Sequence, residues 1–272
     1  MIPIISAFKT SYLESLCSDH SFSYELAETY KAIFGQFPSL IAAESTRHGG
    51  VSPAPFNSLN LGGSTQDSLE NVTENNVRFF SALHVPLDNV AKSHQVHGDQ
   101  ILNVHAAGRF EGFDALITNV PGIQLAVTIA DCTPILIYDS VKKAVAAIHA
   151  GWRGTVAQIV AKTLEKMGND FGTKPMDCFA YIGTCIDECS FEVGEDVADH
   201  FDLNFKRWDA EKQKYFVDLK QANLTQLVEK GVRSDNIEIS NYSTVLNNDD
   251  YFSYRLEKGQ TGRLLATIGI TN

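Results

Sequence analysis

The sequence lacks the features that would place it in a membrane or outside the cell. No apolar run reaches the ~18 residues that a membrane-spanning helix needs, so we expect no transmembrane segment. The opening MIPIISAFKTSYLESLCSDH has neither a basic n-region nor a long apolar stretch, so we expect no secretory signal. Five cysteines, an odd number in a 272-residue chain, favour reduced thiols. These absences predict a cytoplasmic protein.

Positive charge is also scarce. The chain has 22 Lys and Arg against 33 Asp and Glu, a formal net charge of -11. Because the phosphate backbone of nucleic acids favours a basic surface, this balance argues against a nucleic-acid partner. It remains compatible with a small anionic substrate held by a few local arginines. The 44% of hydrophobic residues is that of a globular protein and excludes wholesale disorder.

The chain has no repeat, low-complexity tract or linker that would divide it into two domains. It also lacks the glycine fingerprint of a dinucleotide-binding fold, which excludes a Rossmann fold. The apolar runs that are present predict strands. They are Ser39–Ala43, Ile101–Val104, Ala115–Thr118, Gln124–Ala130, Ile135–Tyr138, Ala144–His149, Phe179–Ile182, Ile237–Ser240 and Leu264–Ile270. Helices are expected from Asp67, with Glu70 at the capping-box position, and over Thr155–Met167 and Asp218–Lys230. Clustered strands and irregularly spaced helices predict an α+β fold, a single domain of mixed β-sheets flanked by helices. Residues 1–36 are expected to form a helical extension, and residues 37–272 the domain proper.

One predicted hairpin brings reactive side chains together. Its strands are Ile135–Tyr138 and Ala144–His149. If the turn is centred near Val141, Cys132 faces Ala150 and His149 faces Thr133. Cys132 and His149 then lie together at the open end of the hairpin, roughly 5–8 Å apart.

A second cluster, Ser93-His94-Gln95-Val96-His97-Gly98, supplies two more imidazoles. A thiolate with two imidazoles suits Zn²⁺, and three protein ligands leave the fourth position that a catalytic zinc needs. The same pair of residues also fits a Cys–His nucleophile. The plain structural alternative is a buried core thiol beside a strand-end histidine. The glycine-flanked Trp152-Arg153 that follows His149 favours a recognition site over core packing.

Seven short motifs occur along the chain in the order typical of one protein family. They are Arg47-His48-Gly49-Gly50-Val51-Ser52, Ser58-Leu59-Asn60-Leu61-Gly62, Gln95-Val96-His97-Gly98, Ala130-Asp131-Cys132, His149-Ala150-Gly151-Trp152-Arg153-Gly154, Phe191-Glu192-Val193-Gly194 and Phe252-Ser253-Tyr254-Arg255. From about Ser39 to its end, the chain resembles the multi-copper polyphenol oxidoreductase, or laccase-domain, family, later linked to purine nucleoside metabolism. It departs from the family pattern at Gly183-Thr184-Cys185 and at Ser243-Thr244.

The resemblance implies a zinc site of His97, Cys132 and His149, with copper the less favoured metal. It also implies purine nucleoside phosphorylase, adenosine deaminase and methylthioadenosine phosphorylase activities in one pocket, with a purine nucleoside and phosphate as the small-molecule partners. The implied fold has a β-sandwich core, similar to the catalytic domain of cytotoxic necrotizing factor. Nothing in the sequence indicates an oligomeric state.

Three further residues are candidates for the site. Asp131 adjoins Cys132 and is expected to orient a metal-bound water or an imidazole, or to have a plain structural role. Arg47 and Arg153 lie in glycine-bearing loops and are candidates for holding phosphate, against surface salt bridges as the alternative.

Two rival functions follow from the same residues. One is a cysteine hydrolase or amidase built on Cys132 and His149, acting on a cell-wall precursor, a role also connected with bacterial members of the family. The other is a true laccase, whose four coppers call for about ten histidines, several as His-x-His pairs. The chain has eight histidines and no His-x-His, so only weak copper-dependent polyphenol oxidation is expected.

Overall fold

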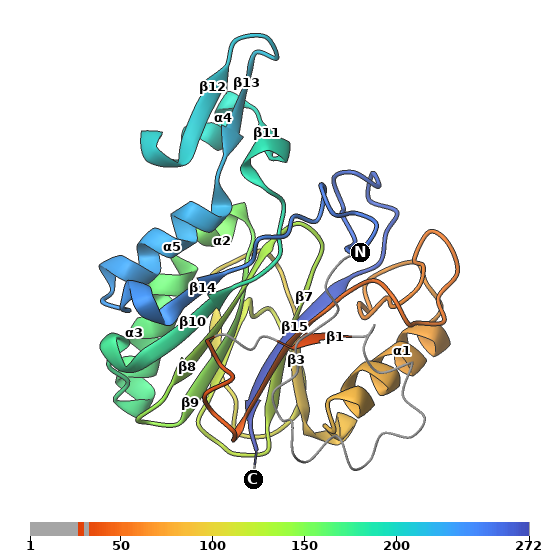
Figure 1. The fold of residues 1–272 in the computed structure, drawn as a ribbon, viewed down its shortest axis with the longest axis vertical. Coiled ribbons are helices and arrows are strands. Elements are labelled where there is room, and N and C mark those ends of the chain that lie inside the picture. The colour runs from red at the N-terminus through yellow and green to blue at the C-terminus, as the bar shows by residue number, and fades with distance from the viewer. Residues whose placement is uncertain (1–26, 30–32, 272) are drawn as a thin grey trace.

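Two six-stranded β-sheets lie face to face at the centre of a computed structural model, which describes residues 27–29 and 33–271 (Figure 1). The first sheet has the order β1 (Ala27–Thr29), β2 (Leu40–Ser45), β15 (Leu264–Ile270), β7 (Gln124–Ile129), β3 (Val90–His94) and β5 (Gly108–Glu111). The second has the order β14 (Ile237–Ile239), β10 (Cys178–Ile182), β8 (Thr133–Asp139), β9 (Ala144–Ala150), β6 (Ala115–Thr118) and β4 (Ile101–Asn103). Both sheets mix parallel and antiparallel pairs, which confirms the predicted α+β class.

The main core fills the space between the two sheets. Its buried side chains include Leu125 and Val127 of β7, Ala266 and Ile268 of β15, Leu136 and Tyr138 of β8, and Val145 and Ala147 of β9. Along β7 these side chains alternate with Ala126, which packs on the other face of the same sheet. The two-residue period of a strand thus gives β7 one face toward the second sheet and one face toward a helix.

Helices cover the outer faces of both sheets. The helix α1 (Leu69–Ala82) packs Phe79 and Phe80 on the first sheet. On the second sheet, α3 (Ile159–Phe171) and α5 (Leu219–Glu229) form a further apolar layer beside α2 (Trp152–Val156) (Figure 1). No helix within the described residues has both the length and the apolar content to cross a membrane.

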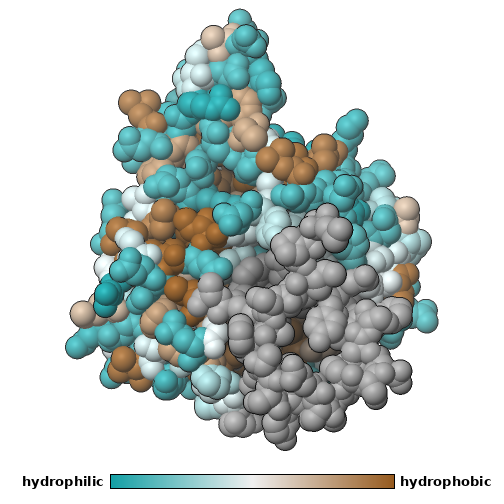
Figure 2. Space-filling model, viewed as in Figure 1, coloured by the Kyte–Doolittle hydropathy of each residue, from teal (hydrophilic) through white to brown (hydrophobic). Residues whose placement is uncertain are grey.

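A small three-stranded sheet projects from one end of the molecule (Figure 1). Its strands are β11 (Glu192–Val193), β13 (Lys214–Val217) and β12 (Lys206–Asp209), and the short helix α4 (Glu195–Ala198) packs beside it. The tip at residues 210–214 is exposed and largely hydrophilic (Figure 2). Short 3-10 turns complete the chain at Leu87–Asn89, Pro175–Asp177, Glu188–Ser190, Leu203–Phe205 and Ser234–Asn236.

The structure corrects three local predictions. The cap of α1 is Ser68, whose Oγ accepts the Asn71 N–H, because the carboxylate of Asp67 is engaged by Ser52 and Asn60 instead. The helix predicted over Thr155–Met167 is two helices, α2 and α3, separated by Gln158 in the left-handed conformation (φ 64°). Within the expected helical extension, Ala27–Thr29 form a strand, while residues 1–26 and 30–32 lie outside the described residues.

Candidate metal and ligand site

Three side chains from distant parts of the chain converge where the two sheets meet. His97 follows β3 of the first sheet, Cys132 lies on the connection from β7 to β8, and His149 is on β9 of the second sheet. Their donor atoms all lie within 4.8 Å of one another, and the two imidazole centroids are 4.9 Å apart. Cys132 lies beside His149, as the predicted hairpin requires. The register is shifted by one residue, since Pro134 pairs with His149 and Thr133 with Ala150.

A buried carboxylate, Asp114, holds two of these residues in place. Its Oδ1 lies 2.8 Å from His149 Nδ1 and also accepts the His97 N–H, at 3.0 Å. Its Oδ2 accepts the N–H groups of Val96 and Gly98. One side chain therefore fixes the loop that carries His97 and leaves His149 Nε2 for the cluster, an arrangement typical of metal-ligating histidines.

The electrostatics of the cluster favour a thiolate. Burial alone would raise the pKa of the Cys132 thiol, but the charge and hydrogen bonds of His149 and His97 outweigh burial and lower this pKa to about 6. Burial likewise opposes protonation of His149, yet Cys132 and Asp114 raise the pKa of its imidazole to about 9. The sulfur of Cys132 is thus negatively charged and is stabilised by a neighbouring positive charge. A divalent ion would supply such a charge.

Two glycines of the His149–Gly154 motif allow this convergence. A Cβ on Gly151 would lie 3.1 Å from both Cys132 Sγ and His97 Cδ2, tighter than ordinary van der Waals contact. A Cβ on Gly154 would lie 2.9 Å from the Gly98 carbonyl oxygen. Both positions need glycine because the loop that carries His97 packs directly on them.

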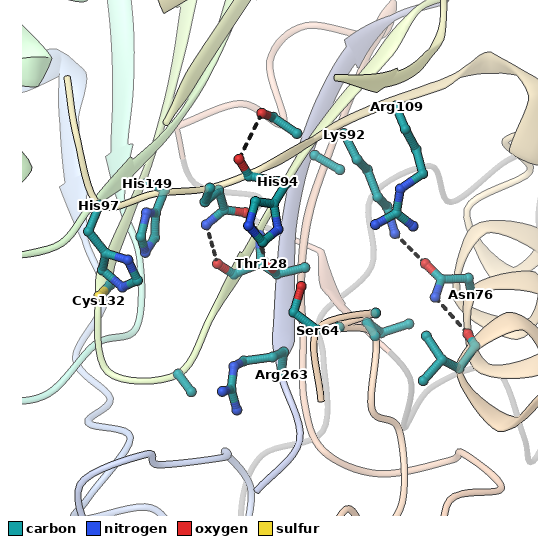
Figure 3. Close-up of a pocket in the computed structure, with 18 of the residues that line it drawn as sticks. Ser64, Asn76, Lys92, His94, His97, Arg109, Thr128, Cys132, His149 and Arg263 are labelled. Carbon is teal, nitrogen blue, oxygen red and sulfur yellow. Dashed lines mark hydrogen bonds between the residues drawn. The ribbon is translucent and has the colours of Figure 1, made fainter. Parts of the chain in front are cut away.

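The cluster opens into a cavity of about 1010 Å³ between α1 and the first sheet (Figure 3). This is the upper end of the ~300–1,000 Å³ typical of small-molecule sites. Although the chain is acidic overall, the charged side chains on the cavity wall are mainly cationic. Lys92, Arg109, Arg153, Arg255 and Arg263 line it, against Asp88 and Asp131. An anionic ligand fits this wall better than a cationic one.

The structure separates the predicted phosphate-binding arginines. Arg153 lines the cavity, with its guanidinium carbon 4.4 Å from the centre of the Trp152 ring. Arg47 lies outside the cavity: it is buried, and its guanidinium donates to the carbonyls of Asn57 and Asn248 and to Glu257. The Arg47 side chain thus ties two loops together outside this cavity, and its predicted contact with phosphate stays a prediction.

Asp131 lines the cavity, but it does not orient either imidazole. Its Oδ1 accepts the Thr244 hydroxyl and its Oδ2 accepts the Arg255 N–H, both at 2.6 Å. It fastens the loop that carries Tyr254 and Arg255 to the start of β8. The carboxylate that orients His149 is Asp114, which lies 35 positions away in the sequence and belongs to none of the seven motifs. Sequence reasoning also missed Lys92 and Arg109, since no motif marks them.

Residues 41–271 match the family described as multi-copper polyphenol oxidoreductase laccase, and the chain belongs to this family. A Deinococcus radiodurans protein named purine nucleoside phosphorylase is 40% identical over 230 residues, covering 84% of this chain and 88% of its own. A Bacteroides thetaiotaomicron protein of the same name is 37% identical over 242 residues, covering 83% and 90%. These matches confirm the resemblance inferred from the motifs.

Solved structures share the fold. The crystal structure of YlmD from Geobacillus stearothermophilus superposes with a TM-score of 0.86 at 31% identity, covering 91% of this chain and 97% of its own. The Bacillus licheniformis hypothetical protein YfiH gives a TM-score of 0.85 at 30% identity, with the same coverage. The two-sheet arrangement is therefore common to these proteins.

Proposed function

We propose that this protein is a purine nucleoside phosphorylase, acting on adenosine, inosine, guanosine and methylthioadenosine. The observation that carries the proposal is the His97–Cys132–His149 cluster at one side of a cavity lined by cations. The names of the relatives support it, since these proteins are called purine nucleoside phosphorylases. The cavity is large enough for a nucleoside together with phosphate.

The donor set suits zinc better than copper or magnesium, because it joins one thiolate to two imidazoles in a site with an open side. His97, Cys132 and His149 would hold the ion, and the ion would supply a Lewis acid facing the cavity. The observation on which this fit rests is the buried Asp114–His149 hydrogen bond, which turns the ring toward Cys132.

In phosphorolysis, an oxygen of phosphate attacks C1′ of the ribose and the C1′–N9 bond breaks. Its electron pair goes to the purine, which takes up a proton and leaves as the free base, and the sugar leaves as ribose 1-phosphate. Arg153 and Arg263 are proposed to balance the charge of the attacking phosphate, because both side chains line the cavity.

Hydrolytic deamination of adenosine is proposed as a second reaction in the same cavity. An oxygen from water replaces the 6-amino group, which leaves as ammonia. Asp131 is the residue proposed to move protons, because its carboxylate adjoins Cys132 in the chain and lines the cavity.

The first test is steady-state assay of the metal-retaining protein with adenosine or inosine, with and without phosphate. We expect free base and ribose 1-phosphate only when phosphate is present, and loss of turnover on chelation with recovery on adding zinc. The substitutions His97→Ala and His149→Ala should lower kcat at least ~100-fold. Matched controls are His105→Ala and Cys189→Ser, both exposed and outside the cavity. Full activity of His149→Ala would contradict the proposal.

A cysteine hydrolase or amidase acting on a cell-wall precursor is the second candidate, favoured by the low pKa of Cys132 beside His149. The two candidates differ in how they respond to zinc. A hydrolase would be inactivated by iodoacetamide at Cys132 equally with and without zinc, whereas a metal site would be protected. Polyphenol oxidation is not proposed as the main activity, since one three-donor cluster within the described residues falls short of a four-copper set.

A further inference from the structure

Two cationic side chains stand together at the side of the cavity away from the His97–Cys132–His149 cluster. Lys92 of β3 and Arg109 of β5 are direct partners in the parallel register of these strands, so both leave the same face of the sheet. Figure 3 shows them next to each other, with Ser64, His94 and Arg263 between them and the cluster. Both residues line the cavity.

This pair has no counter-ion within residues 33–271. The ion pairs of that part of the chain include neither residue. Lys92 Nζ instead donates to the neutral amide oxygen of Asn76 on α1 and lies 5.2 Å from the centre of the Phe80 ring. Like charges side by side on neighbouring strands destabilise a sheet, so the fold bears a cost that an anion between them would relieve.

The pKa of Lys92 reflects the same unfavourable surroundings. Burial, with the charge of Arg109 added, lowers the pKa of the Lys92 ammonium to about 7. An anion that contacts both side chains would restore the full charge of Lys92. Groups whose pKa values are strongly shifted tend to cluster at functional sites.

We propose that Lys92 and Arg109, with Asn76 holding Lys92, form a subsite for the phosphoryl group of a ligand. A guanidinium offers a fork that matches two phosphate oxygens, and an ammonium adds a compact charge beside it. The choice of phosphate over other anions rests on the proposed phosphorylase function. The phosphoryl group has two sources, free inorganic phosphate as the second substrate or the phosphate ester of a nucleotide.

The test is equilibrium binding by titration calorimetry on protein purified with its metal. The probes are inorganic phosphate, inosine 5′-monophosphate and, as the neutral reference, inosine, which has no 6-amino group to lose. We expect Lys92→Met and Arg109→Gln each to weaken binding of the anion ~10-fold or more and to leave the binding of inosine unchanged. Lys92→Arg should retain most of the affinity. Lys166→Met and Arg233→Gln, at surface positions outside the cavity, are the matched controls.

The pattern of losses identifies the source. Weaker binding of inorganic phosphate indicates the second substrate, and weaker binding of the monophosphate alone indicates a nucleotide ligand. The proposal is overturned if the wild type binds neither anion, if neither variant changes anion binding, or if inosine binding falls as much as anion binding. Each probe is titrated alone, so no phosphorolysis takes place, and a protein that binds phosphate here but lacks phosphorylase activity refutes only the proposed function.

Discussion

At the scale of the single residue, the charge of Lys92 in the cavity lowers the stability of the folded protein. Its ordinary pKa of 10.5 falls to about 7 in the folded protein, so the unfolded chain holds the proton more tightly than the folded one. Lys92 therefore destabilises the fold. The cost is complete below pH 7, shrinks as the pH rises from 7 toward 10.5, and is absent above that.

We expect Lys92→Met to raise the melting temperature at pH 7 by about 2–4 °C, the shift that ~1 kcal/mol produces in a chain of about this size. The gain should diminish between pH 7 and pH 10. Differential scanning calorimetry of wild type and variant in phosphate-free buffer measures both effects. A lower melting temperature of Lys92→Met at pH 7 would contradict the inference that Lys92 destabilises the fold.

Cys132 is the second residue whose chemistry can be measured alone. In metal-stripped protein, its pKa of about 6 means that the thiolate predominates at pH 7. We expect iodoacetamide to alkylate Cys132 with a half-maximal rate near pH 6 and zinc to block the reaction. Mass spectrometry can compare Cys132 with Cys189, whose pKa is raised by its hydrogen bond to Asp187. A reaction at Cys132 that begins only above pH 8 would disagree with the structure.

At the scale of the element, one carboxylate organises a loop and a strand. Asp114 immediately precedes β6 and accepts three consecutive backbone N–H groups, from Val96 to Gly98, besides its contact with His149. These bonds also lower the pKa of the Asp114 carboxyl against the opposing effect of its burial. The His97 loop has its shape because this acceptor is buried beneath it.

The substitution Asp114→Asn keeps the size of the side chain but replaces one acceptor oxygen with an amide donor. We expect zinc affinity to fall 10–100-fold, the usual effect of losing such a partner. Competition with a chelator of known affinity measures the change. Asp99→Asn is the control, since Asp99 lies in the same loop but pairs with exposed Lys162. Unchanged zinc affinity in Asp114→Asn would show that Asp114 does not position His97 and His149 for metal binding.

Elements with clear apolar patterns were predictable, and those held by distant contacts were not. The strand Leu264–Ile270 and the helix capped by Asp218 match their predictions. The break between α2 and α3 does not, because neither proline nor glycine marks it. Gln226 of α5 supports the break: its side-chain amide donates to the Thr155 carbonyl and accepts the Ala161 N–H. The strand β12 is largely charged, and the apolar run of β13 is only three residues long, so no strand was predicted for either segment.

In the candidate site, contacts within one hairpin were predictable, whereas contacts between strands distant in the chain were not. Adjacency along one hairpin placed Cys132 beside His149, because local pairing follows from strand periodicity. Asp114 and the Lys92–Arg109 pair depend on which strands become neighbours in each sheet. The partners of Arg47 were likewise not predictable, since its guanidinium donates to the carbonyls of Asn57 and Asn248, the second of which lies 201 positions away.

At the scale of the whole molecule, the proposed metal ligands bridge the two sheets. His97 belongs to the end of the first sheet and His149 to the second, while Cys132 lies between them. An ion bound only by the folded protein stabilises it according to its free concentration and affinity. We expect saturating zinc to raise the free energy of unfolding by about 4 kcal/mol at 1,000 times the dissociation constant.

Thermal unfolding with graded zinc measures this effect, and the melting temperature should rise with each increment. In His149→Ala the rise should be largely lost, whereas in His105→Ala it should match the wild type. Equal responses of both variants to zinc would mean that the ion binds elsewhere.

The position of Cys132 on the crossing between the sheets has a consequence for biogenesis. The donor set cannot be complete until β3, the β7–β8 connection and β9 have all docked, which requires contacts between residues far apart in the chain. A nascent chain in which β9 has not yet docked therefore lacks a complete set of donors. Binding of the proposed zinc would follow this docking, so we expect protein made without zinc to be activated by later addition of zinc without new synthesis.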